Sequence, residues 1–363
     1  MDDGNCTITG GTITGFKAQN GGAVYMEGGT FNMTGGTIEN CRAKYNSTAG
    51  VGGNGGAVYI NDASGSATLN ITGGTITGNY ADRNGGGVYL EGGNVNISGG
   101  TLTGNKALEK NQDDYGNGGG IYLMKGNYTM TGGTISGNTA NSNGGGVFVS
   151  SPSASGNDIT VDIRQGTITR NSSERFGAGL YVKPGGSNSA TVNIGISGET
   201  SNTDPEITWN SASLRGGGIY VEGSNARLNM YEGMVKNNSV SAYVYNQDIA
   251  NQNGEVTLAL NSTTGLPIPD LYYITITFDP AGGNFTDGNT AGTSSKTYLV
   301  KATNSKLNIP TPKRRNFTFK GWVPSQGEAD TGHADSEYDN ATGGSMTFNY
   351  DKDITLTATW QAN

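Results

Sequence analysis

Apolar and polar positions alternate along this chain in short runs that return many times. In the phrase Gly74–Asn79, Ile76 is flanked by Thr75 and Thr77. Period-two alternation places the isoleucine on one face of a strand and the two threonines on the other. The phrase occurs eight times in the first 250 residues, and its apolar position is held by Ile13, Ile38, Ile76, Leu102, Ile135, Ile168, Ile207 and Val235.

Two further strands complete each repeat. In the Gly-Gly-Val-Tyr phrase, Val88 and Leu90 are predicted to face the core while Tyr89 faces outward, and the next strand buries Val95 and Ile97. A single repeat cannot bury its own apolar face, so successive repeats must stack on one another. Three core-facing strands in every repeat predict a three-faced coil.

The repeats differ in length but keep the order of their strands. Thr75 and Thr101 are 26 residues apart, whereas Thr134 and Thr167 are 33 apart, so insertions are confined to loops. Each strand aligns with its own copy one repeat later, as in a parallel sheet. Right-handed crossovers predominate between parallel strands. We therefore expect an all-β chain in which residues 1–262 form a right-handed, three-faced parallel β-helix of about eight coils.

A column of asparagines follows the Thr-Ile-Thr strand, and stacked amide side chains can bond to one another and to backbone. Phe16 and Cys41 hold this column in the first two coils, so the asparagine ladder should begin at the third. Cys6 falls instead in the column of Phe31; a Cys6–Cys41 disulfide and two free thiols both remain open. The ladder is predicted to contain Asn79, Asn105, Asn138, Asn171, Asn210 and Asn238.

Composition supports a turn-rich fold and excludes several protein classes. Glycine supplies 62 of 363 residues without a collagen period, and charged residues are only 14%, unlike a charged disordered chain. The formal charge of −8 argues against nucleic acid, which is bound through Lys and Arg. No apolar run is long enough to be a membrane-spanning helix. We expect a monomer with no nucleic-acid partner.

The repeat stops after residue 260, and a second domain with a different pattern follows. Residues 263–272 contain Pro267 and Pro269 and are predicted to be a linker. Residues 273–363 then alternate apolar and polar positions, as in Ile274–Phe278 and Ile354–Trp360, which predicts strands of a small, mostly β domain.

Three ordered motifs in this second domain carry a family resemblance. Phe278–Gly283 reads FDPAGG, Pro310–Trp322 reads PTPKRRNFTFKGW, and Asp353–Trp360 reads DITLTATW. Together they resemble the Listeria-Bacteroides repeat, also called the internalin B-repeat, over about residues 273–361. Asn316 stands where that family usually has glycine, and Val323 stands where tyrosine is common.

The resemblance implies a β-grasp-like module of bacterial envelopes that serves as a spacer or weak binder. The repeats of residues 1–262 are similar, more loosely, to the Gly-Gly-Ala-Ile repeats of bacterial adhesin passengers. Both resemblances imply an extracellular protein on the bacterial cell surface.

Candidate catalytic groups are sparse. Asp113 and Asp114 are the only adjacent acidic pair in a long insertion of the repeats, and a glycosidase needs two converging carboxylates. A solvated turn is the simpler interpretation of this pair. The cationic residues Arg42, Arg83, Lys106 and Arg175 are scattered over loops and do not form, with acidic residues, a pair that repeats from coil to coil. The single histidine, His333, lies in the second domain. We expect no catalytic residues, metal or cofactor; the alternative is a polysaccharide lyase or hydrolase built on the β-helix.

An outward row of aromatic residues is the candidate ligand-binding site. Rigid aromatic rings in an exposed line can bind a glycan or a host protein, although stacking that only stabilises the coil explains the same pattern. The insertions at 43–53 and 106–117 are the next candidates. We therefore expect a non-enzymatic adhesin-like protein that binds host or glycan ligands. The predicted site consists of Tyr25, Tyr59, Tyr89, Tyr122, Phe148, Tyr181 and Tyr220.

Overall fold

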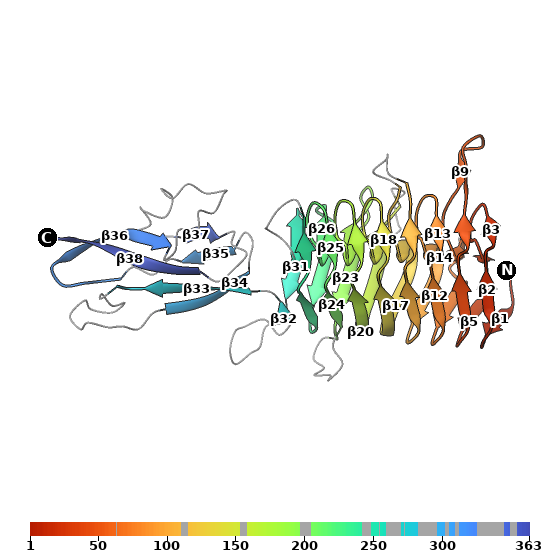
Figure 1. Cartoon of the computed structure of the whole chain (residues 1–363), viewed down its shortest axis with the longest axis horizontal. Helices are drawn as coiled ribbons and strands as arrows, with labels where there is room; N and C mark the ends of the chain where they lie inside the picture. Colours follow the sequence, from red (N-terminus) through yellow and green to blue (C-terminus); the bar gives the residue numbers. More distant parts are fainter. Residues whose placement is uncertain are drawn as a thin grey trace. The chain divides into compact units, whose positions relative to one another are not determined.

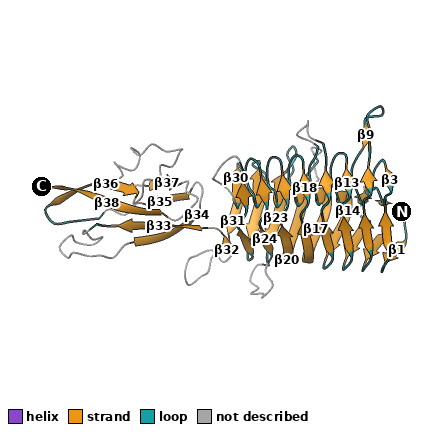
Figure 2. Ribbon diagram, viewed as in Figure 1, coloured by secondary structure: helices purple, strands orange, loops and turns teal. Residues whose placement is uncertain are grey.

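A computed structural model shows that the chain is all-β and divides into two compact units, Met1–Leu271 and Tyr272–Asn363. The described residues contain strands and turns but no helix (Figure 2). Accordingly, no helix among them qualifies as a membrane span. The structure describes residues 1–62, 64–109, 115–152, 158–196, 205–241, 248–253, 255–258, 270–271, 273–281, 296–301, 305–308, 312–324, 345–348 and 354–363.

The first unit is a solenoid in which each strand pairs in parallel with its own copy one coil later (Figure 1). One column of stacked strands contains the Val-Tyr phrase of each repeat, and we call it the tyrosine column. In this column Tyr59 is in register with Tyr25 and Tyr89. Its strands are β4 (Val24–Met26), β10 (Val58–Ile60), the start of β14 (Val88–Ile97), the start of β17 (Ile121–Ser136), β19 (Val147–Ser150), β22 (Leu180–Lys183), β26 (Ile219–Glu222) and β30 (Ile249–Gln252).

Two more long columns follow in every coil. The amide column consists of β1 (Asn5–Ile8), β5 (Thr30–Met33), β11 (Thr68–Ile71), the later parts of β14 and β17, the start of β20 (Ile159–Thr169), β23 (Ala190–Ile194), β27 (Ala226–Met230) and β31 (Glu255–Leu258). The threonine column consists of β2 (Thr12–Thr14), β6 (Thr37–Glu39), β12 (Thr75–Thr77), β15 (Thr101–Thr103), the ends of β17 and β20, β24 (Glu206–Thr208), β28 (Met234–Lys236) and β32 (Asp270–Leu271).

A fourth, short column was not predicted. Its two-residue strands bury a small side chain such as Ala81 or Ala107, and a run this short carries no recognisable alternation. They are β3 (Lys17–Ala18), β7 (Arg42–Ala43), β13 (Tyr80–Ala81), β16 (Lys106–Ala107), β18 (Thr139–Ala140), β21 (Ser172–Ser173), β25 (Ser211–Ala212) and β29 (Ser239–Val240).

The core is a stack of like residues on like, as the alternation predicts. Val88, Leu90, Val95 and Leu102 are fully buried, and so are their counterparts in the neighbouring coils. Burying each such side chain contributes about 1.5–3 kcal/mol. Cys41 is also buried, whereas Cys6 is exposed and pairs in register with Phe31, so the two cysteines are free thiols in different columns.

The solenoid continues into the segment expected to be a linker. β32 (Asp270–Leu271) pairs in parallel with Met234 and Val235 of β28 and so adds a strand to the threonine column. The division between the two units falls after Leu271, near the end of the expected linker 263–272. Of that segment, residues 263–269 and 272 lie outside the described residues.

The second unit contains a four-stranded mixed sheet. β33 (Tyr273–Asp279) runs antiparallel to β34 (Lys296–Lys301) and parallel to β38 (Ile354–Ala362), which in turn is antiparallel to β36 (Phe317–Pro324). β35 (Ser305–Asn308) and β37 (Ser345–Phe348) form a separate antiparallel pair.

Candidate ligand-binding surface

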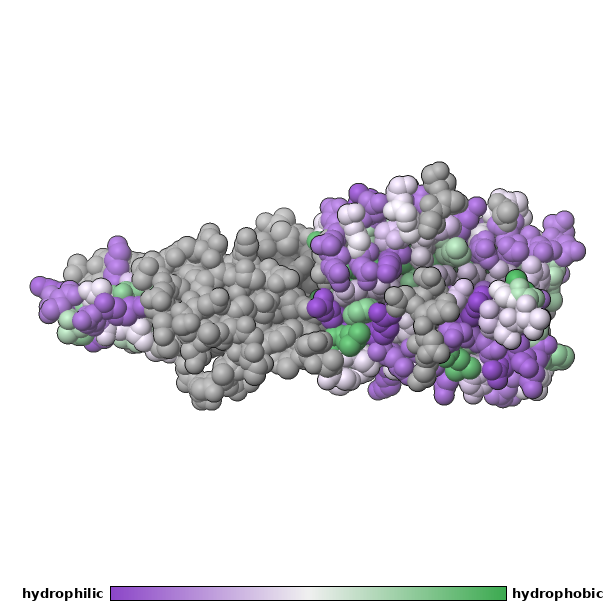
Figure 3. All heavy atoms as spheres, turned by 90° about the horizontal axis from the view of Figure 1, so that it is seen from above, coloured by the Kyte–Doolittle hydropathy of each residue, from purple (hydrophilic) through white to green (hydrophobic). Residues whose placement is uncertain are grey.

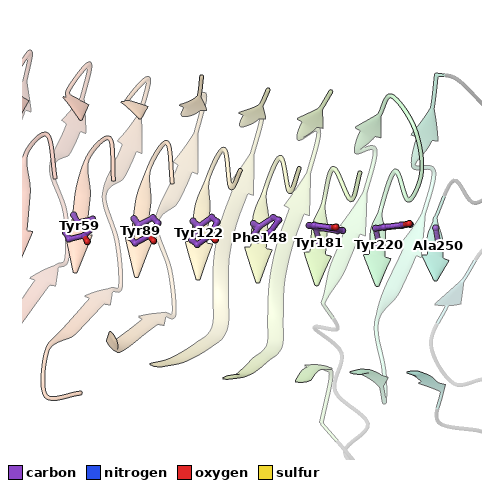
Figure 4. Packing of buried hydrophobic residues seen from close by; sticks show 7 residues of the cluster. All are labelled: Tyr59, Tyr89, Tyr122, Phe148, Tyr181, Tyr220 and Ala250. Carbon is purple, nitrogen blue, oxygen red and sulfur yellow. The ribbon is translucent and has the colours of Figure 1, made fainter. Parts of the chain in front are cut away.

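The predicted aromatic residues form one continuous stack along the tyrosine column (Figure 4). From Tyr25 to Tyr220, consecutive ring centroids lie 4.8–5.4 Å apart. This spacing is close to the roughly 4.8 Å between adjacent strands. The rings are stacked within 16° of parallel, except that Phe148 and Tyr181 are tilted by 54°. The predicted single line of rings is confirmed.

The stack is buried from Tyr59 to Tyr220, with only Tyr25 at its end partly exposed, which corrects the expectation that it forms an exposed platform. Tyr89 is 5% exposed, Tyr122 8%, and Tyr181 and Tyr220 1% each. Neighbouring rings cover both faces of each ring inside the stack. The preceding glycine turn closes over its base: a Cβ added to Gly85 would lie 2.9 Å from the Cβ of Tyr89. A ligand could stack on the rings from Tyr59 to Tyr220 only if the coil opened, because in the folded coil these rings pack against each other.

The hydroxyl groups of the stack bond to side chains of the following coil. Tyr59 donates a hydrogen bond to Glu91, and Tyr181 donates one to Glu222. Burial, and then the hydrogen bond to the carboxylate, raise the pKa of both tyrosines well above the ordinary value. They therefore remain protonated donors at physiological pH, which further fixes the stack in place.

The asparagine ladder is confirmed, with its start at the third coil as predicted. Asn138 is fully buried; its Nδ2 donates to Oδ1 of Asn171 and to the carbonyl of Leu102, both at 3.0 Å. Its Oδ1 accepts from the backbone N–H and the Nδ2 of Asn105. In the second coil only the backbone N–H of Cys41 reaches the ladder. Full bonding offsets the cost of burying each amide.

A carboxylate ends the ladder, which the repeat pattern did not predict. Oδ1 of Asp248 accepts from the backbone N–H of Asn238 at 3.0 Å and from its Nδ2 at 2.8 Å. Asp248 occupies a position that is glycine in earlier coils. Its carbonyl accepts a hydrogen bond from the backbone N–H of Ile219, just as the carbonyl of Gly218 accepts one from the backbone N–H of Leu180. Burial raises the pKa of Asp248 to about 6.

A second asparagine ladder, which the repeat pattern did not predict, lies before the glycine turns. Asn143 donates from its backbone N–H and its Nδ2 to Oδ1 of Asn117, at 3.0 and 2.9 Å. The backbone N–H groups of Asn117, Asn84 and Asn54 bond in the same way to the asparagine one coil earlier. The signal was the asparagine before each glycine pair, at Asn20, Asn54, Asn84, Asn117 and Asn143.

An outer amide row on the amide column presents polar groups to solvent. Asn70 donates to Asn32 at 2.8 Å and Asn96 donates to Asn70 at 2.9 Å, with all three side chains at least partly exposed. The row resumes with Asn193 bonded to Asp162 at 2.8 Å and with Asn229 bonded to Asn193. Each amide has two N–H groups, so one remains for a ligand. Hydrophilic residues predominate on the solenoid face in Figure 3.

The corner after the threonine column requires a left-handed backbone, and one coil places a tryptophan there. Gly78, Gly104 and Gly137 hold this corner with φ of 60–65°. Trp209 holds it with φ of 58° and is 58% exposed. A bulky residue in this conformation costs about 1–2 kcal/mol relative to glycine. With 58% of the residue exposed, burial offsets this cost only in part, and no other described coil places an aromatic residue at this corner.

Two of the long insertions, 43–53 and 106–117, are held together by a cation between two rings. The guanidinium carbon of Arg83 lies 3.8 Å from the ring centroid of Tyr45 and 4.0 Å from that of Tyr115. Tyr45 belongs to the hairpin of β8 (Tyr45–Asn46) and β9 (Val51–Gly52). The carboxylate of Asp82 fixes the base of this hairpin by accepting a hydrogen bond from the backbone N–H of Tyr45, and it also pairs with Arg42 at 2.6 Å. These groups are engaged with each other, which makes them a brace for the loops.

The candidate catalytic residues fall outside this geometry. Asp113, Asp114 and His333 lie outside the described residues. Of the scattered cations, Arg42 and Arg83 belong to the loop brace. Across the part of the chain that the structure describes, no group of three or more His, Cys, Asp and Glu side chains is placed to hold a metal ion.

Comparison with known proteins supplies no relative from which a function could be transferred. No protein-family model, curated protein or solved structure matches the chain. The site therefore has to be interpreted from its own side chains. Two asparagine ladders and an aromatic stack, all largely buried, form the scaffold, and the outer amide row and Trp209 are among the groups that reach solvent.

Proposed function

We propose that this chain is a non-enzymatic, adhesin-like protein of the bacterial cell surface whose solenoid binds host or glycan ligands. In this proposal the solenoid is a right-handed β-helix, as parallel crossovers favour. Residues 273–363 form a β-grasp-like module of the internalin B-repeat type and act as a spacer. The motifs FDPAGG, PTPKRRNFTFKGW and DITLTATW support the surface location by resemblance.

The observation that carries the binding proposal is the outer amide row. Asn32, Asn70 and Asn96 come from three successive coils and are held by hydrogen bonds of 2.8 and 2.9 Å. Their orientation is thus set before any ligand arrives, which lowers the entropy lost on binding. Amides spaced by one strand separation along a rigid rod suit an extended ligand with repeated hydroxyl or amide groups, and an oligosaccharide has this chemistry.

The proposal is tested by measuring binding and turnover on the same ligands. The whole chain is applied to an oligosaccharide array and to host cells, and every bound polysaccharide is then incubated with the chain and sized by chromatography. We expect saturable binding with no change in ligand length. Shortened or unsaturated products would establish the lyase or hydrolase alternative, and absence of any ligand on array and cells would refute the adhesin proposal.

Surface variants then locate the binding. Replacing Asn70 and Asn96 together by alanine removes two exposed amides and is expected to weaken binding at least tenfold. A double Ala variant of Thr77 and Thr103, half-buried on the neighbouring threonine column, is the matched control and should bind like the wild type. Equal binding by both variants would exclude the outer amide row as the contact surface.

A further inference from the structure

Trp209 occupies a corner whose other positions reveal what the backbone requires. The same corner is glycine in four coils, asparagine at Asn40 and Asn237 and arginine at Arg170, and all of these residues have positive φ. Glycine and asparagine are the residues that adopt this conformation most readily. Folding alone therefore gives no reason for a tryptophan at this position, and a strained residue on an exposed surface is a starting point for a functional hypothesis.

The ring of Trp209 is exposed and lies beside the threonine column. Thr208, next to Trp209, is 6% exposed, and Thr169, next to Arg170, is 7% exposed. The equivalent Thr77 and Thr103, next to glycine corners, are half-buried. The hydroxyl of Thr169 donates to the carbonyl of Thr208 at 2.7 Å and lies 3.3 Å from the hydroxyl of Thr208. The threonines beside the corner are therefore buried and bonded to each other, while 58% of Trp209 is open to solvent.

The residues next to Trp209 in register and along its strand are polar and of mixed charge. Arg170 precedes Trp209 by one coil in the same corner, Asn237 follows it by one coil, and Glu206 opens the same strand. All three side chains are exposed. They offer a guanidinium, an amide and a carboxylate, which between them donate to and accept from hydroxyl groups. A flat apolar surface with a few polar groups at its edge is the usual composition of a small-ligand site.

Charge and area decide what kind of ligand fits. The chain as a whole is acidic, with a formal charge of −8, which disfavours a polyanionic glycan, and near Trp209 the carboxylate of Glu206 offsets the guanidinium of Arg170. A stable protein partner needs about 800 Å² on each side with an apolar centre. Trp209 instead stands alone: the other exposed large hydrophobic residues among those described, Phe16 and Val51, belong to the first two coils.

We propose that Trp209, with Arg170, Glu206 and Asn237, is a binding subsite for a neutral pyranose of a glycan. The indole accepts the C–H face of the sugar, and the three polar side chains bond to its ring hydroxyls. The inference rests on the proposed glycan-binding function and adds to it a second contact and a ligand class, on a different column from the outer amide row.

The test uses the full chain and four variants against neutral hexose and N-acetylhexosamine oligosaccharides, with uronic-acid oligomers for comparison. Trp209→Asn installs the residue that two other coils tolerate at this corner, so its fold is preserved. Trp209→Tyr keeps an aromatic ring, and Arg170→Gly removes a polar neighbour. Phe16→Asn removes an equally exposed ring, 59% exposed, at the other end of the solenoid. Thermal unfolding of each variant is recorded beside its affinity.

We expect Trp209→Asn to lose at least tenfold in affinity for a neutral oligosaccharide without a loss of melting temperature. Trp209→Tyr should stay within about threefold of the wild type, Arg170→Gly should lose several-fold, and Phe16→Asn should be unchanged. Trp209 is the only tryptophan outside the second unit, so its fluorescence should change on binding.

Three results would overturn the inference. Glycan binding that survives in Trp209→Asn would leave the adhesin proposal standing and remove this subsite from it. Binding of uronic-acid oligomers alone would contradict the neutral ligand class. If Trp209→Asn lost attachment only to a host protein, and protease treatment of the host cells abolished attachment, the surface would be a protein contact. If the wild-type chain bound no glycan, the glycan-binding part of the proposed function would itself be refuted.

Discussion

Truncation of one rung of the asparagine ladder should destabilise the solenoid by more than an ordinary surface change. In Asn138→Ala four hydrogen bonds of 3.0 Å are lost: two donated by Nδ2, to Asn171 and Leu102, and two accepted by Oδ1 from Asn105. The backbone N–H of Asn105 then loses the acceptor that it has in the native ladder. The site is fully buried, so water cannot easily replace that acceptor.

The expected loss of stability follows from these groups. An orphaned buried N–H costs about 1–3 kcal/mol, and the other broken bonds contribute about 0.5–1.5 kcal/mol each when their partners keep a second contact. The lower limits of these contributions sum to about 2.5 kcal/mol, and we expect Asn138→Ala to lower the free energy of unfolding by at least that amount. Because each coil depends on its neighbours, hydrogen exchange should accelerate in the coils on both sides.

Denaturant unfolding followed by circular dichroism measures the effect. The matched control is Asn96→Ala, which removes one exposed amide bond of 2.9 Å and should cost less than about 0.5 kcal/mol. If the two variants unfolded at the same denaturant concentration, the buried ladder would not be the source of stability that its geometry indicates.

Three further changes test the core, the aromatic stack and the last rung. Ile135→Asp buries an unpaired carboxylate and should unfold several coils, whereas Ile135→Val should lower the free energy of unfolding by only about 1 kcal/mol. Equal melting temperatures of the two variants would contradict the assignment of Ile135 to the core. Tyr122→Ser removes a ring stacked 4.8 and 4.9 Å from its neighbours and should cost about 3–5 kcal/mol; unchanged melting with lost ligand binding would instead make the stack a binding surface. Burial raises the pKa of Asp248 to about 6, so the folded chain takes up a proton at higher pH than the unfolded chain does. Its ionised form is penalised above pH 6, and stability should rise as the pH falls from 7 toward 4, by up to about 3 kcal/mol relative to Asp248→Asn. Parallel stability–pH curves for the two proteins would contradict this.

The columns of the solenoid could be predicted from the sequence because they depend on local alternation. Ile76 between two threonines is a strand with one apolar face whatever surrounds it, and the return of the same phrase leaves stacking as the only way to bury that face. The in-register pairing of Thr75 with Thr101 and the bonds between Asn79 and Asn105 follow from this repetition, since equal positions come to lie one strand apart.

Other features depend on what lies beside a residue in space. Tyr89 alternates correctly and points away from the aliphatic core, yet it is buried, because rings one coil apart cover its faces and the turn at Gly85 covers its base. Alternation gives the side of a strand on which a residue lies and carries no information on whether another layer covers that side. The fourth column, with two residues in each coil, was too short for any periodicity to be detected.

The sequence by itself determined which residues repeat, which of them face the core and in which order the strands follow. The tertiary structure alone decided where the repetition is interrupted and with what effect. Asp248 completes the ladder from a glycine position, and Trp209 adopts a glycine-like backbone on an open surface. Both outcomes depend on the coils above and below, whose spacing sets the room and the hydrogen-bond partners that each side chain meets. A repeated sequence therefore specifies its scaffold reliably, while its exceptions acquire meaning only from their neighbours in space.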